Sequence, residues 1–294
     1  MQHGYLKANG IRFHVVEQGA PDAPLLLLLH GFPEYWYSWR HQFMPLAEHY
    51  RVVAPDLRGY HLTDKPTTGY DIETLTSDVH ALMEAHGEHT VSLVAHDWGG
   101  MLAWMFAYQY PECLEKLVVL NCPHPVRFLE EWRANPQQLL KSWYILFFQL
   151  PWLPEILLSA NDYAFIESAF RDPRVRPGSF SEADIHLYKQ AIAIPGALTS
   201  AINYYRTLLD PTRLDALVRR SERQKITCPT MLIWGTEDFA LETSLTRDME
   251  RFFTSPLRLE LIPACSHWIQ QEAPEVVNRL LVDFLLRSPL ASAN

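Results

Sequence analysis

The sequence has few cysteines and a shortage of positive charge, and each shortage excludes a class of protein. Its 294 residues contain four cysteines (Cys113, Cys122, Cys228, Cys265), without the paired spacing of a disulfide framework or a zinc site. We therefore expect buried free thiols in a reducing cytoplasm. Lysine and arginine number 25 against 34 aspartates and glutamates, a net charge of −9. This balance, with no basic cluster, argues against a nucleic-acid partner.

Long apolar runs are also missing. Residues 1–10 are polar and lack the apolar segment of a secretory signal. The longest apolar stretch, residues 143–160, is broken by Gln149, Pro151, Pro154 and Glu155, so we expect no membrane span and a cytoplasmic location. Three histidines lie around Gly87, where a helix is expected to end, and we interpret them as capping or solvated rather than as metal ligands. They are His80, His86 and His89.

What is present is a regular alternation of predicted strands and helices over the first 122 residues, which predicts a parallel sheet with helices on both faces. The strands are expected at residues 25–29, 51–55, 91–94 and 117–121, and again at 230–234 and 257–262. Between the two groups the sequence is helical, aromatic and rich in proline. We therefore predict one α/β core domain (1–122 and 225–294) that carries a helical cap (123–224).

The stretch TVSLVAHDWGGMLAWMFAYQY, residues 90–110, passes from a buried strand into a predicted amphipathic helix (101–110) across five residues, HDWGG. So abrupt a turn needs a strained, positive-φ residue and small neighbours. This is the setting of a nucleophile elbow, with Asp97 where serine usually stands. An ordinary connection, with Asp97 as a helix N-cap, is the alternative on these residues alone.

Two more polar residues follow later predicted strands, Asp238 after 230–234 and His267 after 257–262. In open α/β sheets the site lies beyond the carboxyl ends of the strands, and nucleophile, acid, histidine is the chain order of this fold. We therefore predict that Asp97, Asp238 and His267 form a triad, in which Asp238 accepts a hydrogen bond from His267.

An oxyanion hole in this fold uses the backbone N–H of the residue after the nucleophile and another from the loop after the third strand. Here these belong to Trp98 and Phe32. Gly31 lets the loop turn and Pro33 fixes it. A plain turn is compatible with the same residues.

A carboxylate nucleophile limits the reactions that the site can catalyse. It is already ionised at neutral pH and can displace a leaving group from saturated carbon, forming an alkyl ester. His267 then activates the water that hydrolyses this ester. The bond opened is C–O or C–halogen: a halide leaves with N–H donors alone, whereas an epoxide oxygen needs an acid. Tyrosines in residues 141–149 and 203–206 can donate that proton.

Taken together, these motifs resemble the α/β-hydrolase-fold epoxide hydrolases, close to the soluble epoxide hydrolase domain and its relatives. The matching segments are 30–34 (HGFPE), 36–40 (WYSWR), 96–100 (HDWGG), 148–151 (FQLP), 203–206 (NYYR), 237–239 (EDF) and 266–268 (SHW). They sample nearly the whole chain. The resemblance implies the α/β-hydrolase fold, with a mostly parallel eight-stranded sheet flanked by helices and a helical cap. It implies Asp97 as nucleophile, Asp238 and His267 as the water-activating pair, and Tyr144 and Tyr205 as cap acids.

Two other functions fit parts of the pattern. Haloalkane dehalogenases also follow their nucleophile with Trp, but they usually carry Asn where this chain has Phe32, which offers no side-chain donor. A catalytically silent receptor or scaffold on this fold is the third possibility, and the presence of every expected site residue argues against it.

The cap is rich in aromatic residues, which suits an apolar pocket for a hydrophobic aryl or alkyl epoxide and its vicinal diol product. The predicted pocket residues are Phe32, Trp98, Phe147, Phe148 and Trp268. The mechanism uses water and requires no cofactor or metal. The sequence leaves open the natural epoxide, the selectivity, and whether the protein is a monomer or a homodimer.

Overall fold

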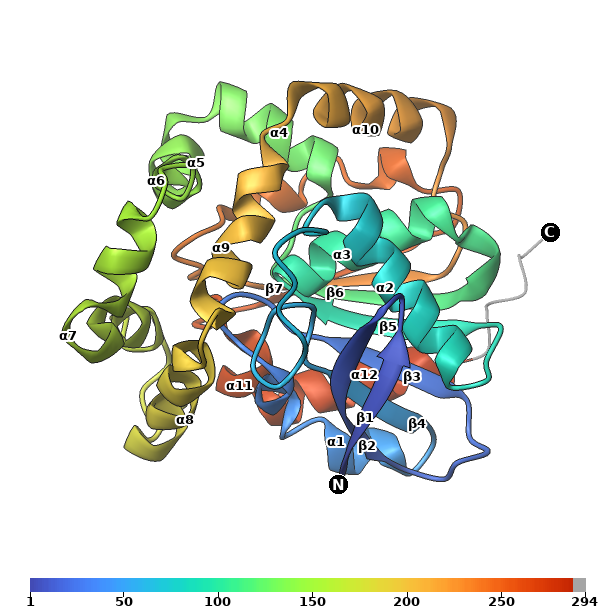
Figure 1. Ribbon diagram of the computed structural model, residues 1–294. Helices are drawn as coiled ribbons and strands as arrows, with labels where there is room; N and C mark the ends of the chain where they lie inside the picture. The colour runs from blue at the N-terminus through green and yellow to red at the C-terminus, as the bar shows by residue number, and fades with distance from the viewer. Residues whose placement is uncertain (288–294) are drawn as a thin grey trace.

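The protein is seen in a computed structural model that describes residues 1–287, apart from the side chains of residues 211, 213 and 214. The sequence predicts that the last residues, 289–294, are frayed, and they lie outside this range. Eight strands of the described range form one sheet in the order β1-β2-β4-β3-β5-β6-β7-β8 (Figure 1). The strands are β1 (Gln2–Ala8), β2 (Ile11–Gln18), β3 (Leu25–Leu29), β4 (Arg51–Pro55), β5 (Val91–His96), β6 (Leu114–Leu120), β7 (Thr230–Gly235) and β8 (Leu257–Ile262).

Strand directions in the sheet follow the predicted pattern. β2 pairs antiparallel with β1 and β4, and all other neighbours are parallel. The β1–β2 hairpin turns at Asn9 and Gly10, which have φ values of 42° and 79°. The predicted α/β fold with a mostly parallel eight-stranded sheet is confirmed.

Helices cover both faces of the sheet because successive residues of a buried strand point to opposite faces. On β3, Leu25, Leu27 and Leu29 pack in the cluster that includes residues of α2 and α3, whereas Leu26 and Leu28 pack with α1 and α12. These helices are α1 (Phe43–Ala47), α2 (Ile72–Ala85), α3 (Trp98–Gln109) and α12 (Pro274–Leu286), with the short α11 (Ile269–Glu272) before the last. All four cysteines are buried free thiols, as predicted.

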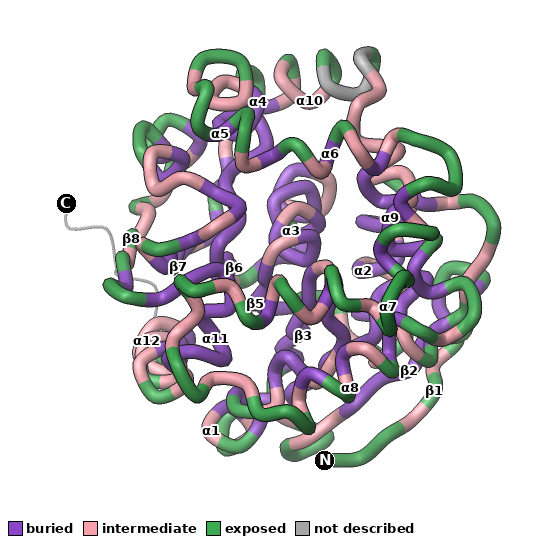
Figure 2. Tube along the Cα trace, turned by 90° about the vertical axis from the view of Figure 1, so that its left-hand side faces the viewer, coloured by how far each residue is buried: buried purple, intermediate pink, exposed green. Residues whose placement is uncertain are grey.

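Seven helices lie between β6 and β7, within the stretch predicted as a cap. They are α4 (Pro125–Ala134), α5 (Pro136–Lys141), α6 (Trp143–Phe147), α7 (Leu153–Phe170), α8 (Glu182–Ala193), α9 (Ala197–Leu208) and α10 (Pro211–Arg223). Hydrogen bonds join them to loops at the carboxyl ends of the strands: Tyr204 donates to the carbonyl of Arg58, and Lys141 to that of Asp238. The cap therefore covers the edge of the sheet where the site was expected (Figures 1 and 2). The domain boundaries remain a prediction.

Two helix predictions were wrong in detail. The helix expected at 101–110 begins at Trp98, so that Asp97 alone makes the turn. It is also not amphipathic: it is buried on nearly every side, because α2 packs on it as well as the sheet. The sequence also predicts a helical segment at residues 38–48, but the structure has a 3-10 turn, Trp36–Trp39, followed by the five-residue α1. Pro45 fits within the first turn of α1, where its missing N–H costs no helical hydrogen bond.

Candidate active site

Asp97 stands between β5 and α3 with φ of 50° and ψ of −119°, which is strained for a residue with a side chain. The close packing around it requires small residues. A Cβ at Gly99 would lie 2.2 Å from the carbonyl oxygen of Leu29, and one at Gly31 would lie 2.3 Å from the Cβ of Asp97. Asp97 makes no side-chain cap to α3. The geometry is that of a nucleophile elbow and not of an N-capped connection.

The structure brings the predicted triad together. His267 Nδ1 lies 2.7 Å from Asp238 Oδ2, and His267 Nε2 lies 3.5 Å from Asp97 Oδ2. The backbone N–H groups of Ala240 and Leu241 donate to the other oxygen of Asp238, at 2.7 and 2.9 Å. His267 therefore lies between two carboxylates, one fixed by hydrogen bonds and one facing the cavity.

Each charged group of the triad shifts the pKa of its neighbours so that the charged forms are favoured. Burial alone would lower the pKa of His267, but the charge of Asp238 and hydrogen bonds to both carboxylates raise it to about 10. Burial would raise the pKa of Asp97 and of Asp238, and the neighbouring His267 holds both below their ordinary value. At neutral pH the resting site thus contains an imidazolium between two carboxylates.

The two predicted oxyanion-hole residues flank Asp97. The N–H of Phe32 donates to Asp97 Oδ1 at 2.7 Å. Trp98 is the first residue of α3, where backbone N–H groups have no partner within the helix. Both donors thus belong to segments that meet at the carboxylate.

Tyr144, from α6, and Tyr205, from α9, face the same cavity as Asp97 and His267. Their rings lie edge to face, with centroids 5.7 Å apart. Burial raises the pKa of both phenols, and the charge of Asp97 raises it further. Both hydroxyls therefore stay protonated at neutral pH. By contrast, Tyr204 points away and hydrogen-bonds the core, as its position one residue earlier on the helix predicts.

The cavity above Asp97 has a volume of about 510 Å³. Of the predicted pocket residues, Phe32, Phe148 and Trp268 line it. Phe147 does not, because its ring lies behind, against Trp143 (centroids 5.6 Å apart) and Phe148 (5.8 Å).

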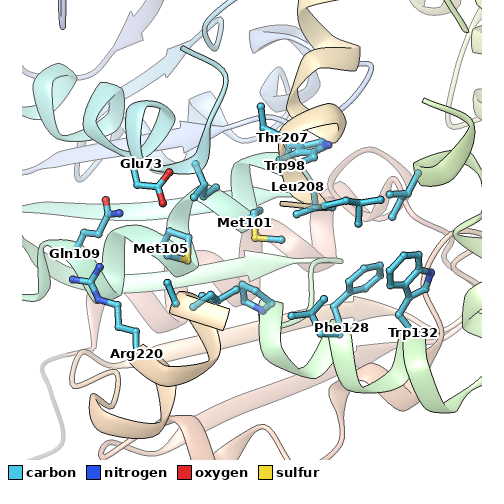
Figure 3. A pocket seen from close by; sticks show the side chains of 17 residues that line it. Glu73, Trp98, Met101, Met105, Gln109, Phe128, Trp132, Thr207, Leu208 and Arg220 are labelled. Carbon is cyan, nitrogen blue, oxygen red and sulfur yellow. The ribbon is translucent and has the colours of Figure 1, made fainter. Parts of the chain in front are cut away.

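A second, apolar cavity of about 130 Å³ lies on the other side of Trp98 (Figure 3). Met101 and Met105 of α3 form one wall, and Phe128 and Leu208 of the cap line it as well. A small space of about 60 Å³, lined by both Asp97 and Met101, lies between the two cavities. Trp98 therefore lines the rear space rather than the main cavity.

A buried network that the sequence did not reveal holds the site together. One Glu34 oxygen lies 2.8 Å from His96 Nδ1, and the other accepts from the amides of Gln270 and Gln271. The second ring nitrogen of His96 lies 2.8 Å from the carbonyl of His267. Glu34 thus ties the Phe32 loop, the end of β5 and the His267 segment to one another.

Asn121 is a second residue that was missed. It follows β6 with φ of 41°, and its Nδ2 donates to Asp238 Oδ2 at 2.6 Å while its Oδ1 accepts from the N–H of Gly235 at 3.1 Å. This fixes the carboxylate that orients His267. Its position as the last residue of a predicted strand (117–121) was a usable signal.

Among the described residues, one group of side chains has the composition of a metal site: His14, Asp56 and His61. Both imidazoles lie within hydrogen-bonding distance of the same Asp56 oxygen, at 2.7 and 2.8 Å, so the three groups satisfy one another. The group lies apart from the triad. Of the other histidines, His86 caps α2 through the carbonyl of Leu82 and His89 is exposed, as predicted, whereas His80 is half-buried and stacks on Tyr110.

Comparison with known proteins agrees with this geometry. Residues 24–274 match the model of the α/β hydrolase fold family. The chain is 40% identical to human epoxide hydrolase 4 over 286 residues, covering 95% of this chain and 77% of that protein. It is also 40% identical to epoxide hydrolase 3 of Xenopus tropicalis, covering 100% and 80%.

Solved structures give the same result. A variant of an epoxide hydrolase from Bacillus megaterium, in complex with its product (R)-3-[1]naphthyloxy-propane-1,2-diol, superposes with a TM-score of 0.86 at 30% identity, covering 97% of this chain and 100% of that one. The fold and the elbow define an α/β hydrolase. Within that class, the chain belongs to the epoxide hydrolases. No helix in the described range has the length and apolar character that crossing a bilayer demands.

Proposed function

We propose that the protein converts hydrophobic epoxides to vicinal diols through a covalent ester on Asp97. The observation that carries the proposal is that two protonated phenols, Tyr144 and Tyr205, share one cavity with Asp97 and His267. A carboxylate that attacks saturated carbon serves a dehalogenase equally well. Only an epoxide needs proton donors beside it, because its oxygen leaves as an alkoxide.

In the first step, an oxygen of Asp97 attacks one ring carbon and the C–O bond of the epoxide breaks. The released oxygen takes a proton from Tyr144 or Tyr205, and the product is a hydroxyalkyl ester. The pKa of Asp97 is lowered, so its carboxylate is ionised before the reaction and can attack the ring carbon. The resting imidazolium then returns its proton, through solvent, to the tyrosinate.

Ester formation itself prepares the second step. It removes the negative charge of Asp97, one of the two carboxylates that raise the pKa of His267. The pKa of His267 therefore falls, and the neutral ring, still held by Asp238, becomes a base for water. The hydroxide adds to the ester carbonyl, whose oxygen is stabilised by the N–H groups of Phe32 and Trp98. Collapse of this adduct takes a proton from His267 into the departing diol, and the regenerated Asp97 carboxyl returns one to the ring.

The shape of the site supports an epoxide with bulky apolar substituents. Phe148 and Trp268 provide aromatic walls for one substituent in the main cavity. The small space beside Met101 leads from Asp97 toward the rear cavity, which suits a second apolar arm. The aryl diol bound by the Bacillus megaterium enzyme belongs to the same class of product.

Incubation of the purified protein with styrene oxide and, in parallel, with 1-bromobutane tests this function. We expect phenylethanediol from the first and no bromide release from the second, because the site offers acids for an alkoxide. Bromide release without diol would contradict the proposal and identify a dehalogenase instead.

The paired replacement Tyr144→Phe with Tyr205→Phe tests the acids. We expect each single variant to lose about 10²-fold in the rate of ester formation and the double variant to lose more, since each lost donor leaves the developing alkoxide less stabilised. Single-turnover kinetics measure this step. Tyr204→Phe, one residue away and directed at the core, is the matched control. Full activity in the double variant would place the acid elsewhere.

A further inference from the structure

The large apolar side chains that are exposed in the described residues are concentrated in the cap. Of the seventeen large apolar side chains that are exposed in the described part of the chain, ten lie between residues 139 and 165. We call them the cap patch: Leu139, Leu140, Trp143, Leu146, Leu150, Trp152, Leu153, Ile156, Leu157 and Phe165. Leu140 is 72% exposed and Trp152 is 71% exposed. A cluster of exposed apolar side chains on a protein surface marks an interaction site.

The cap patch extends over α5, α6 and, as far as Phe165, α7, and these helices lie along the outer edge of the cap (Figure 1). Trp143 of α6 and Phe165 of α7 meet with ring centroids 6.3 Å apart, so the two helices contribute to one surface. Figure 2 looks onto this side of the molecule.

The same surface borders the opening of the active-site cavity. Leu140, Trp143 and Phe165 belong to the cap patch and also line the cavity that contains Asp97. Because these side chains are both exposed and pocket-lining, the cavity reaches the outside between them. Whatever covers the cap patch therefore also controls the route of substrate to the site.

The charged side chains in the cap patch limit the chemical class of its binding partner. Residues 139–165 carry three charged side chains, and each is paired: Lys141 with Glu242 at 2.9 Å, Glu155 with Arg206 at 2.8 Å, and Asp162 with Lys189 at 2.6 Å. The chain as a whole has a net charge of −9. The charged side chains within the cap patch are thus all paired, although the protein as a whole is acidic, and such a face fits a partner without net charge and not a basic or an acidic one.

We propose that the cap patch docks on a zwitterionic lipid surface, and that apolar epoxides pass from that surface into the cavity. Exposed tryptophans together with leucine and isoleucine are the side chains that enter the interface of a bilayer. A second copy of the chain is less suitable, because a symmetric pairing of caps would close the cavity mouth in both copies. The delivery of epoxide rests on the proposed function; the docking does not.

Flotation of the full chain with phosphatidylcholine vesicles tests the docking. We expect the wild-type chain to float with the vesicles. The variant Trp152→Ser with Ile156→Ser, away from the cavity mouth, is expected to lower the ratio of bound to free protein by about tenfold or more. The control variant, Met44→Ser with Leu261→Ser, removes exposed apolar side chains outside the cap patch and should float as the wild type does.

Turnover of styrene oxide in vesicle-free buffer separates docking from catalysis, and it should be equal in all three proteins. The proposal is supported if the variant Trp152→Ser with Ile156→Ser no longer floats with the vesicles but keeps full turnover. It is overturned if the wild type does not float, or if the two variants float equally. It is also overturned if sedimentation shows a dimer that the Trp152 variant alone abolishes while vesicles bind neither protein. Absence of turnover in the wild type would contradict the proposed function and leave the flotation result valid.

Discussion

Replacement of Asp97 by Asn is expected to reduce turnover of styrene oxide by about 10⁴-fold or more, because the amide has no charge with which to attack saturated carbon. The fold should survive, since the amide oxygen still accepts the hydrogen bond that Phe32 donates to Asp97 Oδ1. Initial rates of diol formation, measured beside thermal unfolding, separate these two effects.

This variant needs a check on its chemistry. The amide carbon stands where the ester carbonyl would, so water activated by His267 can convert it slowly back to the acid. Intact-protein mass therefore has to be followed, and Asp97→Ala, which cannot revert, is the matched control. Appreciable activity in protein shown to be free of revertant would remove Asp97 as the nucleophile.

The change His267→Gln is expected to separate the two chemical steps. Asp97 keeps its charge and both tyrosines remain, so ester formation continues, whereas water loses its base and hydrolysis slows by about 10²- to 10⁴-fold. The ester should accumulate as a mass increase equal to one substrate molecule on the peptide that contains Asp97.

Two companions sharpen this experiment. Adding Asp97→Ala to the His267 variant should abolish the mass increase, which shows that the adduct is on the predicted carboxylate. Asn121→Ala leaves all three triad residues in place but removes the donor 2.6 Å from Asp238 Oδ2, so it should slow hydrolysis more than ester formation. A His267→Gln protein that forms no adduct under substrate excess would count against a covalent intermediate.

The sequence predicted the positions of the triad because each member follows a strand, and the carboxyl ends of parallel strands meet at one edge of the sheet. Asp97, Asp238 and His267 do meet there. The residues that hold them escaped prediction for a different reason. The Glu34–His96 bond spans 62 residues of sequence and the Asn121–Asp238 bond spans 117, and, unlike the triad, neither pair follows a known order of residues along the chain, so only the fold shows that they are partners.

The cap was also predicted only in part. Its helical character followed from composition, but which face of a short helix points into the cavity depends on packing against its neighbours. Phe148 therefore lines the cavity while Phe147, its neighbour, turns back toward Trp143. The burial of α3 on nearly every side likewise could not be predicted from periodicity, since α2 and the sheet both pack against this helix.

The central claim is that an oxygen of Asp97 bonds to substrate carbon before water takes part. A single turnover with excess enzyme in H₂¹⁸O tests it most directly. Because water attacks the carboxyl carbon of the ester, the heavy isotope should appear in the side chain of Asp97, and the diol should carry only oxygen from the epoxide and the enzyme. Heavy oxygen in the diol of that first turnover, with an unlabelled Asp97 peptide, would mean that water attacks the epoxide directly, and the account would fail.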